Sequence, residues 1–407
     1  MLEVSNPNSL IEEELDNPAA APAMANGAEA TVTRALGAIL APYSTGTDEL
    51  TWIGSRDAWD ELDIGRLENP NNEFTDAAFP FVGEARWTTD EYIRRIEGFR
   101  EEGLLADENT LARVYLYGAI IYTSIADMFD DFPVDSDRRE GAPPVGPENM
   151  SSLYDTALGY VDAALALEIR APLEIALTGM RARIQYSKSV WQATNPVSGT
   201  PQSNLVNNAG AVEDAIAALD MMDANYVFAM EMDGSLPGLV VGDLSMALQV
   251  NQRAEIGFGT TYVNPEPDGT FESVALRDPI DDIVDPVLEA TITEFIDQAQ
   301  FADIPVVSAR EMHLILAEAA LAGNPNLNYT EEINELRALD DLTPYDGQID
   351  ALELLKHSRR VNLYLQGRRL ADHYRFSDPA PNWSANTPGT FLPITITEIR
   401  ANPNVSQ

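Results

Sequence analysis

Apolar residues recur every three or four positions along most of this chain, which is the spacing of one face of an α-helix. In residues 18–41, an alanine-rich stretch, this face carries Met24, Ala28, Val32, Leu36 and Ile39. Further helices are predicted at residues 88–102, 107–129, 147–167, 171–194 and 206–219. The first of these is polar with an acidic start, and the second has the apolar face of a strongly buried helix.

The predicted helices follow one another at intervals of roughly 20 residues, a cadence typical of tetratricopeptide-like arrays. Gly, Pro and Asn turns separate them, and no repeat follows a strict consensus. Stacked helix pairs of this kind bury a continuous core and leave a concave face for partners.

The pattern changes between residues 226 and 301. The stretches 227–230 and 258–263 have strand character, and turn-forming residues surround them: Gly234, Pro237, Gly238, Pro265, Pro267, Asp268 and Gly269. Long loops inside compact proteins are usually functional or disordered, and the aromatic and apolar content here argues against disorder. We expect a loop-rich insert with short strands.

Helical signals then resume. Ser308 and Glu311 form an S-x-x-E capping box, helices are predicted at 329–339 and 350–365, and Gly367 is predicted to stop a helix before a short one from Arg368. The fold class predicted is all-α, as one domain over residues 1–407. It has helical portions at 18–222 and 305–375, an insert at 223–304 and an extended C-terminal segment at 376–407.

The charge is far from ordinary, because 66 Asp and Glu face 25 Lys and Arg, a net charge of −41. Such a surface repels itself, and at about 1 M salt a Debye length of roughly 3 Å screens the repulsion. Acids spread along the whole chain therefore favour adaptation to high salt over a local surface for cations or basic partners. Nucleic acid is a poor partner, because phosphate binding needs a basic stripe.

Cysteine is absent, which excludes disulfides, thiolate metal sites and cysteine nucleophiles. No apolar run is long enough for a membrane-spanning helix, and the N-terminal residues have no signal-peptide pattern. Taken alone, these observations indicate a cytoplasmic protein, although a chain trimmed of its signal segment would look the same.

Several segments, in order, carry a resemblance to a known family. They are Leu2–Pro7 with its Asn-Pro, the Asp48-Glu49 pair, the helix 112–128 with the turn Phe129-Asp130-Asp131-Phe132-Pro133, and the segments 310–319, 333–337, 358–372 and 393–403. The chain resembles the SusD/RagB family, surface lipoproteins that capture nutrients, often glycans, for an outer-membrane transporter. No single motif is strong, but their order spans nearly the whole chain.

Three positions depart from the family pattern. Ser358, Asn362 and Gln366 stand where the family carries glutamates, so we expect the ion pairs of Arg359, Arg360 or Arg369 to be rearranged. The family's lipidation cysteine is missing, which fits a removed signal segment. The chain is also short for the family, so some ligand-binding loops are expected to be reduced.

The resemblance implies a surface-exposed protein of the cell outer membrane, anchored through an N-terminal lipid. It implies an oligosaccharide or other nutrient as ligand and a SusC-type TonB-dependent transporter as partner, with no cofactor and no chemical step. Two alternatives stay open: a cytoplasmic helical-repeat scaffold that binds peptides, and a helical glycoside hydrolase.

Candidate ligand contacts are aromatic residues on loops, because sugar rings stack on aromatic faces. In the polar loop 47–59, which borders the ligand face in the family, we select Trp52 and Trp59, with Asp48 and Arg56 as partners for hydroxyl groups. Further candidates are Trp383, in the loop 379–387, and Tyr262 and Phe258 in the insert. Trp87 and Trp191 are predicted to be core residues.

Metal and catalytic signals are weak. The cluster Asp127, Asp130, Asp131, Asp135 and Asp137 invites a calcium interpretation, but it lacks the glycine of an EF-hand loop, and we predict no metal site. His313, His357 and His373 are scattered. With 66 acids, carboxylate pairs carry no information, and no G-x-S-x-G elbow is present, so we predict no enzyme.

Overall fold

The computed structural model describes residues 15–134, 141–195, 204–232, 245–266, 270–384 and 388–405. Several predictions lie outside these residues: the N-terminal segment Leu2–Pro7, Asp135 and Asp137, and the insert's turn residues Gly234, Pro237, Gly238, Pro267, Asp268 and Gly269. The all-α prediction is confirmed, because helices dominate and strands are short.

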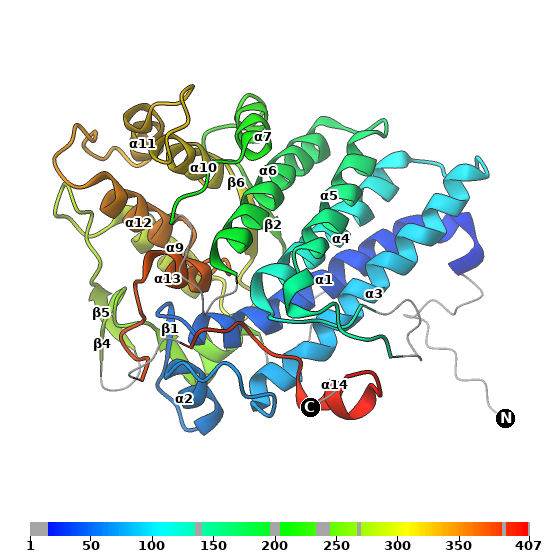
Figure 1. The fold of residues 1–407 in the computed structure, drawn as a ribbon, viewed down its shortest axis with the longest axis horizontal. Coiled ribbons are helices and arrows are strands. Elements are labelled where there is room, and N and C mark those ends of the chain that lie inside the picture. Colours follow the sequence, from blue (N-terminus) through cyan, green and yellow to red (C-terminus); the bar gives the residue numbers. More distant parts are fainter. Residues whose placement is uncertain are drawn as a thin grey trace.

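The first helical layers follow one another along the chain. They are α1 (Ala21–Thr45), α3 (Glu73–Glu101), α4 (Glu108–Met128), α5 (Ser152–Leu165), α6 (Ala171–Thr194) and α7 (Ala209–Leu219). Helix α3 packs on α1 and α4, and each later helix packs on the one before it (Figure 1). Helices α10 (Ala309–Leu321), α11 (Tyr329–Ala338) and α12 (Ala351–Asn362) extend the array from α7, followed by α13 (Arg369–Phe376).

Local sequence explains most helix starts. Side-chain oxygens of Asn72, Asp107, Asn208 and Asp350 accept hydrogen bonds from the first backbone N–H groups of α3, α4, α7 and α12. The predicted cap at Ser308 is confirmed, since its hydroxyl accepts from Glu311 N at 3.1 Å.

Small elements cluster at one end of the helical array, where β1, α2, β4 and β5 lie together (Figure 1). Strand β1 (Leu50–Trp52) pairs antiparallel with β3 (Ile256–Phe258), β2 (Val227–Met230) with β6 (Ile304–Ser308), and β4 (Val263–Pro265) with β5 (Phe271–Val274). The remaining elements are α2 (Asp57–Asp63), α8 (Met246–Leu248), the π-helical turn η4 (Gln249–Arg253), α9 (Pro286–Asp297), α14 (Ile396–Ala401) and 3₁₀ turns at Pro18–Ala20 and Pro147–Asn149.

Four expectations need correction. The helix predicted at 88–102 begins at Glu73, because α3 continues through Pro80. The polar loop 47–59 contains β1 and the start of α2. The insert contains α9, whose N-terminus is capped by Asp285, and the predicted strand 258–263 is two strand ends joined by a turn. The extended C-terminal segment contains α14.

Charged side chains run through the core between distant parts of the chain. Arg375 and Glu318, both fully buried, pair at 2.5 and 3.0 Å. Burial alone would lower the pKa of Arg375, yet the Glu318 carboxylate holds it well above its usual value. Asp372 accepts from Arg359 at 2.8 Å and from Arg375 at 2.9 Å.

Arg359, Arg360 and Arg369, whose ion pairs we expected to be rearranged, each pair with a carboxylate. Their carboxylates come from Asp372, Asp378 and Asp48, and none from positions 358, 362 or 366. The basic segment therefore has an architectural role. None of the helices in the described part of the chain combines the length and apolar character that a membrane crossing needs.

Candidate functional site

Most of the aromatic residues selected from the sequence lie in the core. Trp59 is 1% exposed and stacks on Phe74, with ring centroids 3.6 Å apart and an interplanar angle of 12°. Phe258 and Tyr262 are buried against Tyr364, at centroid distances of 6.4 and 4.5 Å. Side chains buried in this way offer no face to a ligand, so these three positions are corrected from contacts to core.

Trp383 is also buried, because its ring lies against His373 with centroids 4.9 Å apart. Its indole N–H donates to the Gly46 carbonyl at 3.2 Å, which ties the loop before α14 to the end of α1. Trp383 therefore connects two segments of the core, and the prediction that it contacts a ligand is corrected.

Asp48 is a buried anion and no surface partner for hydroxyl groups. It accepts two hydrogen bonds from Arg369, at 2.7 and 2.9 Å, and one from the Tyr262 hydroxyl at 3.1 Å. Burial would raise the pKa of Asp48, but the Arg369 guanidinium holds it well below its usual range. Close packing also requires Gly259, where an added Cβ would lie 1.8 Å from the Asp48 carbonyl oxygen.

Of the selected residues, Trp52 and Arg56 keep exposed surface. Trp52 lies in β1, where its backbone N–H donates to Asp63 at 3.1 Å. Arg56 pairs with Glu73 and lies over the Phe74 ring at 4.7 Å. Arg56 ends the turn that follows β1, which Glu255 holds by accepting from the backbone N–H groups of residues 55 and 56.

A larger concave surface lies elsewhere, between α3, the segment after α4 and α14. This groove has a volume of about 370 Å³, and its lining residues are Phe79, Pro80, Gly83, Glu84, Arg86, Trp87, Phe132, Pro133, Thr397, Glu398 and Ala401. Ligand pockets of small molecules are typically of this size or larger, on the order of 300–1,000 Å³.

Three local features shape the groove. Phe79 and Phe132 stack with centroids 4.8 Å apart and form an apolar floor. Thr397 donates from its backbone N–H and its hydroxyl to Asp76 at 2.9 and 2.8 Å, which fixes the start of α14 on α3. Gly83 leaves open space, since an added Cβ would meet nothing within 4 Å.

The side chains of the groove combine an aromatic face with polar groups. Trp87 is half-buried in the middle of α3, and Glu84 lies one helical turn before it. Glu84 pairs with Arg34, and Glu398 accepts from Asn402 at 2.8 Å, so both carboxylates are oriented. An aromatic ring beside oriented hydrogen-bonding groups can hold a sugar ring on its apolar face.

Sequence reasoning missed this groove because it placed Trp87 at a helix start and assigned it to the core. The first half of α3 was not predicted because Pro80 lies within it, and proline inside a helical pattern usually ends a helix. Had the pattern been continued to the Asn72 cap, Phe79, Gly83 and Trp87 would have fallen on neighbouring turns of one helix.

The acidic cluster has structural partners in its described residues. Asp127 accepts from the Tyr154 hydroxyl at 2.7 Å, and Asp131 accepts from the backbone N–H groups of Phe132 and Gly146 at 2.8 Å. Asp130 accepts from the Thr390 hydroxyl at 3.1 Å, and burial raises its pKa to about 6. Each carboxylate is thus engaged by the protein itself.

A second group, Asp278, Asp285 and His357, brings its ligand atoms within 4.8 Å of one another. Arg337 donates to both oxygens of Asp278, at 2.8 and 3.1 Å, and Asp285 caps α9. His357 Nε2 lies 2.8 Å from Asp285 Oδ2. The Arg337 guanidinium therefore balances the charge of Asp278, while Asp285 is engaged by His357 and by the N-terminus of α9.

No protein-family description matches the chain, and no curated protein matches it. Solved structures do. A SusD superfamily protein from Parabacteroides distasonis is 13% identical, with a TM-score of 0.66 over 98% of this chain and 99% of that one. A SusD-like carbohydrate binding protein from Bacteroides vulgatus is 12% identical, with a TM-score of 0.60 over 96% and 97%. NanU of B. fragilis is 12% identical, with a TM-score of 0.60 over 99% of each chain. The fold is therefore that of the SusD superfamily, as the sequence segments predicted.

Proposed function

We propose that this chain, with its SusD fold, is a cell-surface binding protein that captures an oligosaccharide or other nutrient. It would pass the ligand to a SusC-type TonB-dependent transporter of the outer membrane. The likeness over nearly the full length of both chains supports this role, since the relatives include a SusD-like carbohydrate binding protein. The observation that carries the proposal within this chain is the groove around Trp87.

In this proposal a sugar ring stacks on the ring of Trp87, which lines the groove. Glu84, Glu398 and the Thr397 side chain lie around it as partners for hydroxyl groups, and Gly83 leaves room for the ring to approach α3. The volume suits a short stretch of a glycan, and a longer chain would continue past the open groove.

The patch of Trp52 and Arg56 is the second candidate, retained from the sequence. It offers one half-buried aromatic ring and one guanidinium that already pairs with Glu73. Strand β1, which carries Trp52, lies with α2, β4 and β5 at one end of the molecule, apart from α14 of the groove (Figure 1).

We infer binding without a chemical step. Glycoside hydrolysis needs one carboxyl group held protonated, usually by apolar surroundings, facing a second carboxylate. In the groove, the Glu84 side chain is 40% exposed and paired with Arg34, so its surroundings are not apolar. The hydrolase and the cytoplasmic scaffold remain the alternatives that the experiment must separate.

The test is isothermal titration calorimetry in about 2 M NaCl with a panel of soluble glycans and peptides, each mixture checked for product. We expect one glycan class to bind and Trp87→Ala to weaken it about tenfold, a loss of about 1.4 kcal/mol. Trp52→Ala is the matched control, because it removes another partly buried tryptophan, one that lies outside the groove.

Other outcomes would indicate a different site or a different function. Loss in Trp52→Ala alone would move the site to the second patch, and product formation would establish a hydrolase. Binding of peptides alone would favour the scaffold. The transporter and the outer-membrane location need their own experiment: protease accessibility on intact native cells, and co-purification with a TonB-dependent barrel.

A further inference from the structure

The charges around the Trp87 groove are unevenly balanced. Two carboxylates, Glu84 of α3 and Glu398 of α14, line it, and Arg86 is the one basic residue among its described lining residues. The Arg86 side chain is only 2% exposed, and its Nη1 donates to Asp90 at 3.2 Å. The guanidinium is therefore almost inaccessible, and it is already paired with a carboxylate of the same helix.

The two carboxylates differ in how their charge is compensated. Glu84 forms an ion pair with Arg34 of α1, whose side chain is 20% exposed. Glu398 accepts a hydrogen bond from the neutral amide of Asn402 at 2.8 Å, and no cation of the described chain pairs with it. Arg400, the other charged residue of α14, is exposed and is not among the lining residues. Glu398 therefore brings an uncompensated negative charge to the groove.

The described segments beside this carboxylate add no positive charge to offset it. Thr397, at the start of α14, is fixed to α3 by the Asp76 carboxylate, which is a further anion. The segment after α4 lines the groove with Phe132 and Pro133, which carry no charge. In the sequence, positions 135–140 hold three acids and two arginines. The balance of charge at this wall of the groove is thus negative.

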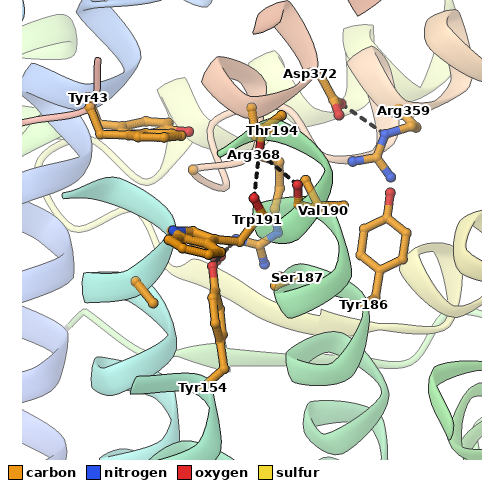
Figure 2. A pocket seen from close by; sticks show the side chains of 15 residues that line it. Tyr43, Tyr154, Tyr186, Ser187, Val190, Trp191, Thr194, Arg359, Arg368 and Asp372 are labelled. Carbon is orange, nitrogen blue, oxygen red and sulfur yellow. Dashed lines mark hydrogen bonds and ion pairs between the residues drawn. The ribbon is translucent and has the colours of Figure 1, made fainter. Parts of the chain in front are cut away.

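The cavity that arginines do line is too small for a sugar ring. Arg359 and Arg368 line a cavity of about 30 Å³ in the core, where Arg359 donates to Asp372 at 2.8 Å (Figure 2). Ligand pockets usually have volumes on the order of 300–1,000 Å³. This cavity therefore offers an acidic glycan no alternative basic site.

We propose that Glu398 makes the groove selective for neutral glycans and excludes glycans whose rings carry carboxylate or sulfate groups. The inference rests on the proposed function, because it assumes that a glycan lies in the groove beside Trp87. Like charges that meet across an interface oppose binding, whereas a neutral hydroxyl group can donate a hydrogen bond to a carboxylate. Glu398 is thus a specificity-determining residue, which accepts from a sugar hydroxyl and repels an acidic group.

The discrimination should persist in concentrated salt. At about 1 M salt the Debye length is roughly 3 Å, so the field of distant surface carboxylates is largely screened. A charge in direct contact with the ligand is screened less, because little solvent lies between the two groups. Selectivity measured at this salt concentration therefore reports on Glu398 rather than on the net charge of −41.

The test is isothermal titration calorimetry in about 1 M NaCl with pairs of tetrasaccharides of β-1,4-glucan, β-1,4-mannan and β-1,4-galactan. Each pair has a neutral member and a counterpart whose C6 hydroxymethyl groups are oxidised to carboxylates. In the pair that binds, we expect the neutral member to be held about fivefold more tightly than the acidic one. Glu398→Gln keeps the size of the side chain and the acceptor oxygen for Asn402, and it should bring the two affinities within a factor of about two.

Glu332→Gln is the matched control, because Glu332 is also partly buried but lies on α11, far from α14 (Figure 1). It removes the same single charge and should leave the ratio of the two affinities unchanged. An equal change of this ratio in Glu332→Gln, or an acidic member that binds as tightly as the neutral one, would overturn the role of Glu398 and leave the proposed function in place. Absence of binding by both members of every pair would refute the proposed function, and this inference with it.

Discussion

Replacing Arg375 with methionine should destabilise this protein more than any surface substitution. Arg375 is fully buried and gives two hydrogen bonds to Glu318, one to Asp372 and one to the Tyr186 hydroxyl. Methionine fills a similar volume but leaves Glu318 as a buried carboxylate whose nearest remaining cation, Arg359, lies 3.7 Å away.

Removing one partner of a buried ion pair costs about 3–5 kcal/mol, because the other charge stays buried without compensation. Whole domains are stable by only about 5–15 kcal/mol, so the loss is a large fraction of the total. Urea unfolding followed by circular dichroism in about 2 M NaCl would measure it, because the salt screens surface charges and leaves the buried pair intact.

Two controls separate this mechanism from a general loss of charge. Arg94→Met removes an arginine whose side chain is 67% exposed and pairs with Glu91, and it should cost at most about 1 kcal/mol. The double variant Glu318→Leu with Arg375→Met should regain much of the loss, because apolar replacement of a whole buried pair is often close to neutral. An Arg375→Met protein within about 1 kcal/mol of Arg94→Met would refute the reasoning.

Three further predictions follow from burial and charge. Burial raises the pKa of Glu49 from 4.5 to about 7. The free energy of unfolding should therefore fall as pH rises across that interval, by about 3 kcal/mol in total. Urea titrations at pH 5 and 8 should show that Glu49→Gln removes this part of the pH dependence. Trp59→Ala should lower the free energy of unfolding by about 3–5 kcal/mol, since it empties the site beside Phe74; glycan affinity of the folded protein, measured by calorimetry, should stay within a factor of two. With a net charge of −41, the melting temperature should rise as NaCl increases from 0.1 to about 2 M, and a flat profile in differential scanning calorimetry would count against adaptation to high salt.

Hydrophobic periodicity predicts the bounds of those helices whose apolar face and capping residues lie in the same short stretch of sequence. Helices α4 and α6 begin and end within a residue or two of the predicted positions, because the buried face and the flanking Asp or Pro lie in the same stretch. The insert was harder, since its strands pair with partners far along the chain, such as β1 with β3 and β2 with β6. Strand pairing of this kind leaves little trace in a local window.

The ligand residues could not be found from residue type alone. A tryptophan on a polar loop and a tryptophan under it have the same local sequence, and only the distant partner decides between them. Trp59 is buried because Phe74, from another helix, covers it, and Trp383 because His373 lies against it. Trp87 lines a groove because Gly83, one turn before it, has no side chain and α14 lies across from this part of α3.

The buried bonds between the two ends of the chain set an order for biosynthesis. Asp48 and Glu49 lie in the core. Asp48 accepts from the Arg369 guanidinium, 321 positions later, and Glu49 accepts from the backbone N–H of Leu365, 316 positions later. While the chain emerges from the ribosome, Asp48 lacks its guanidinium partner and Glu49 has, of these bonds, only the one from the nearby Ser44 hydroxyl. The first helices can form, but their packing should close only when the C-terminal segment arrives. A chain released early would then stay open to proteases, and we expect an intermediate with formed helices whose core closes last, when the C-terminal segment is available.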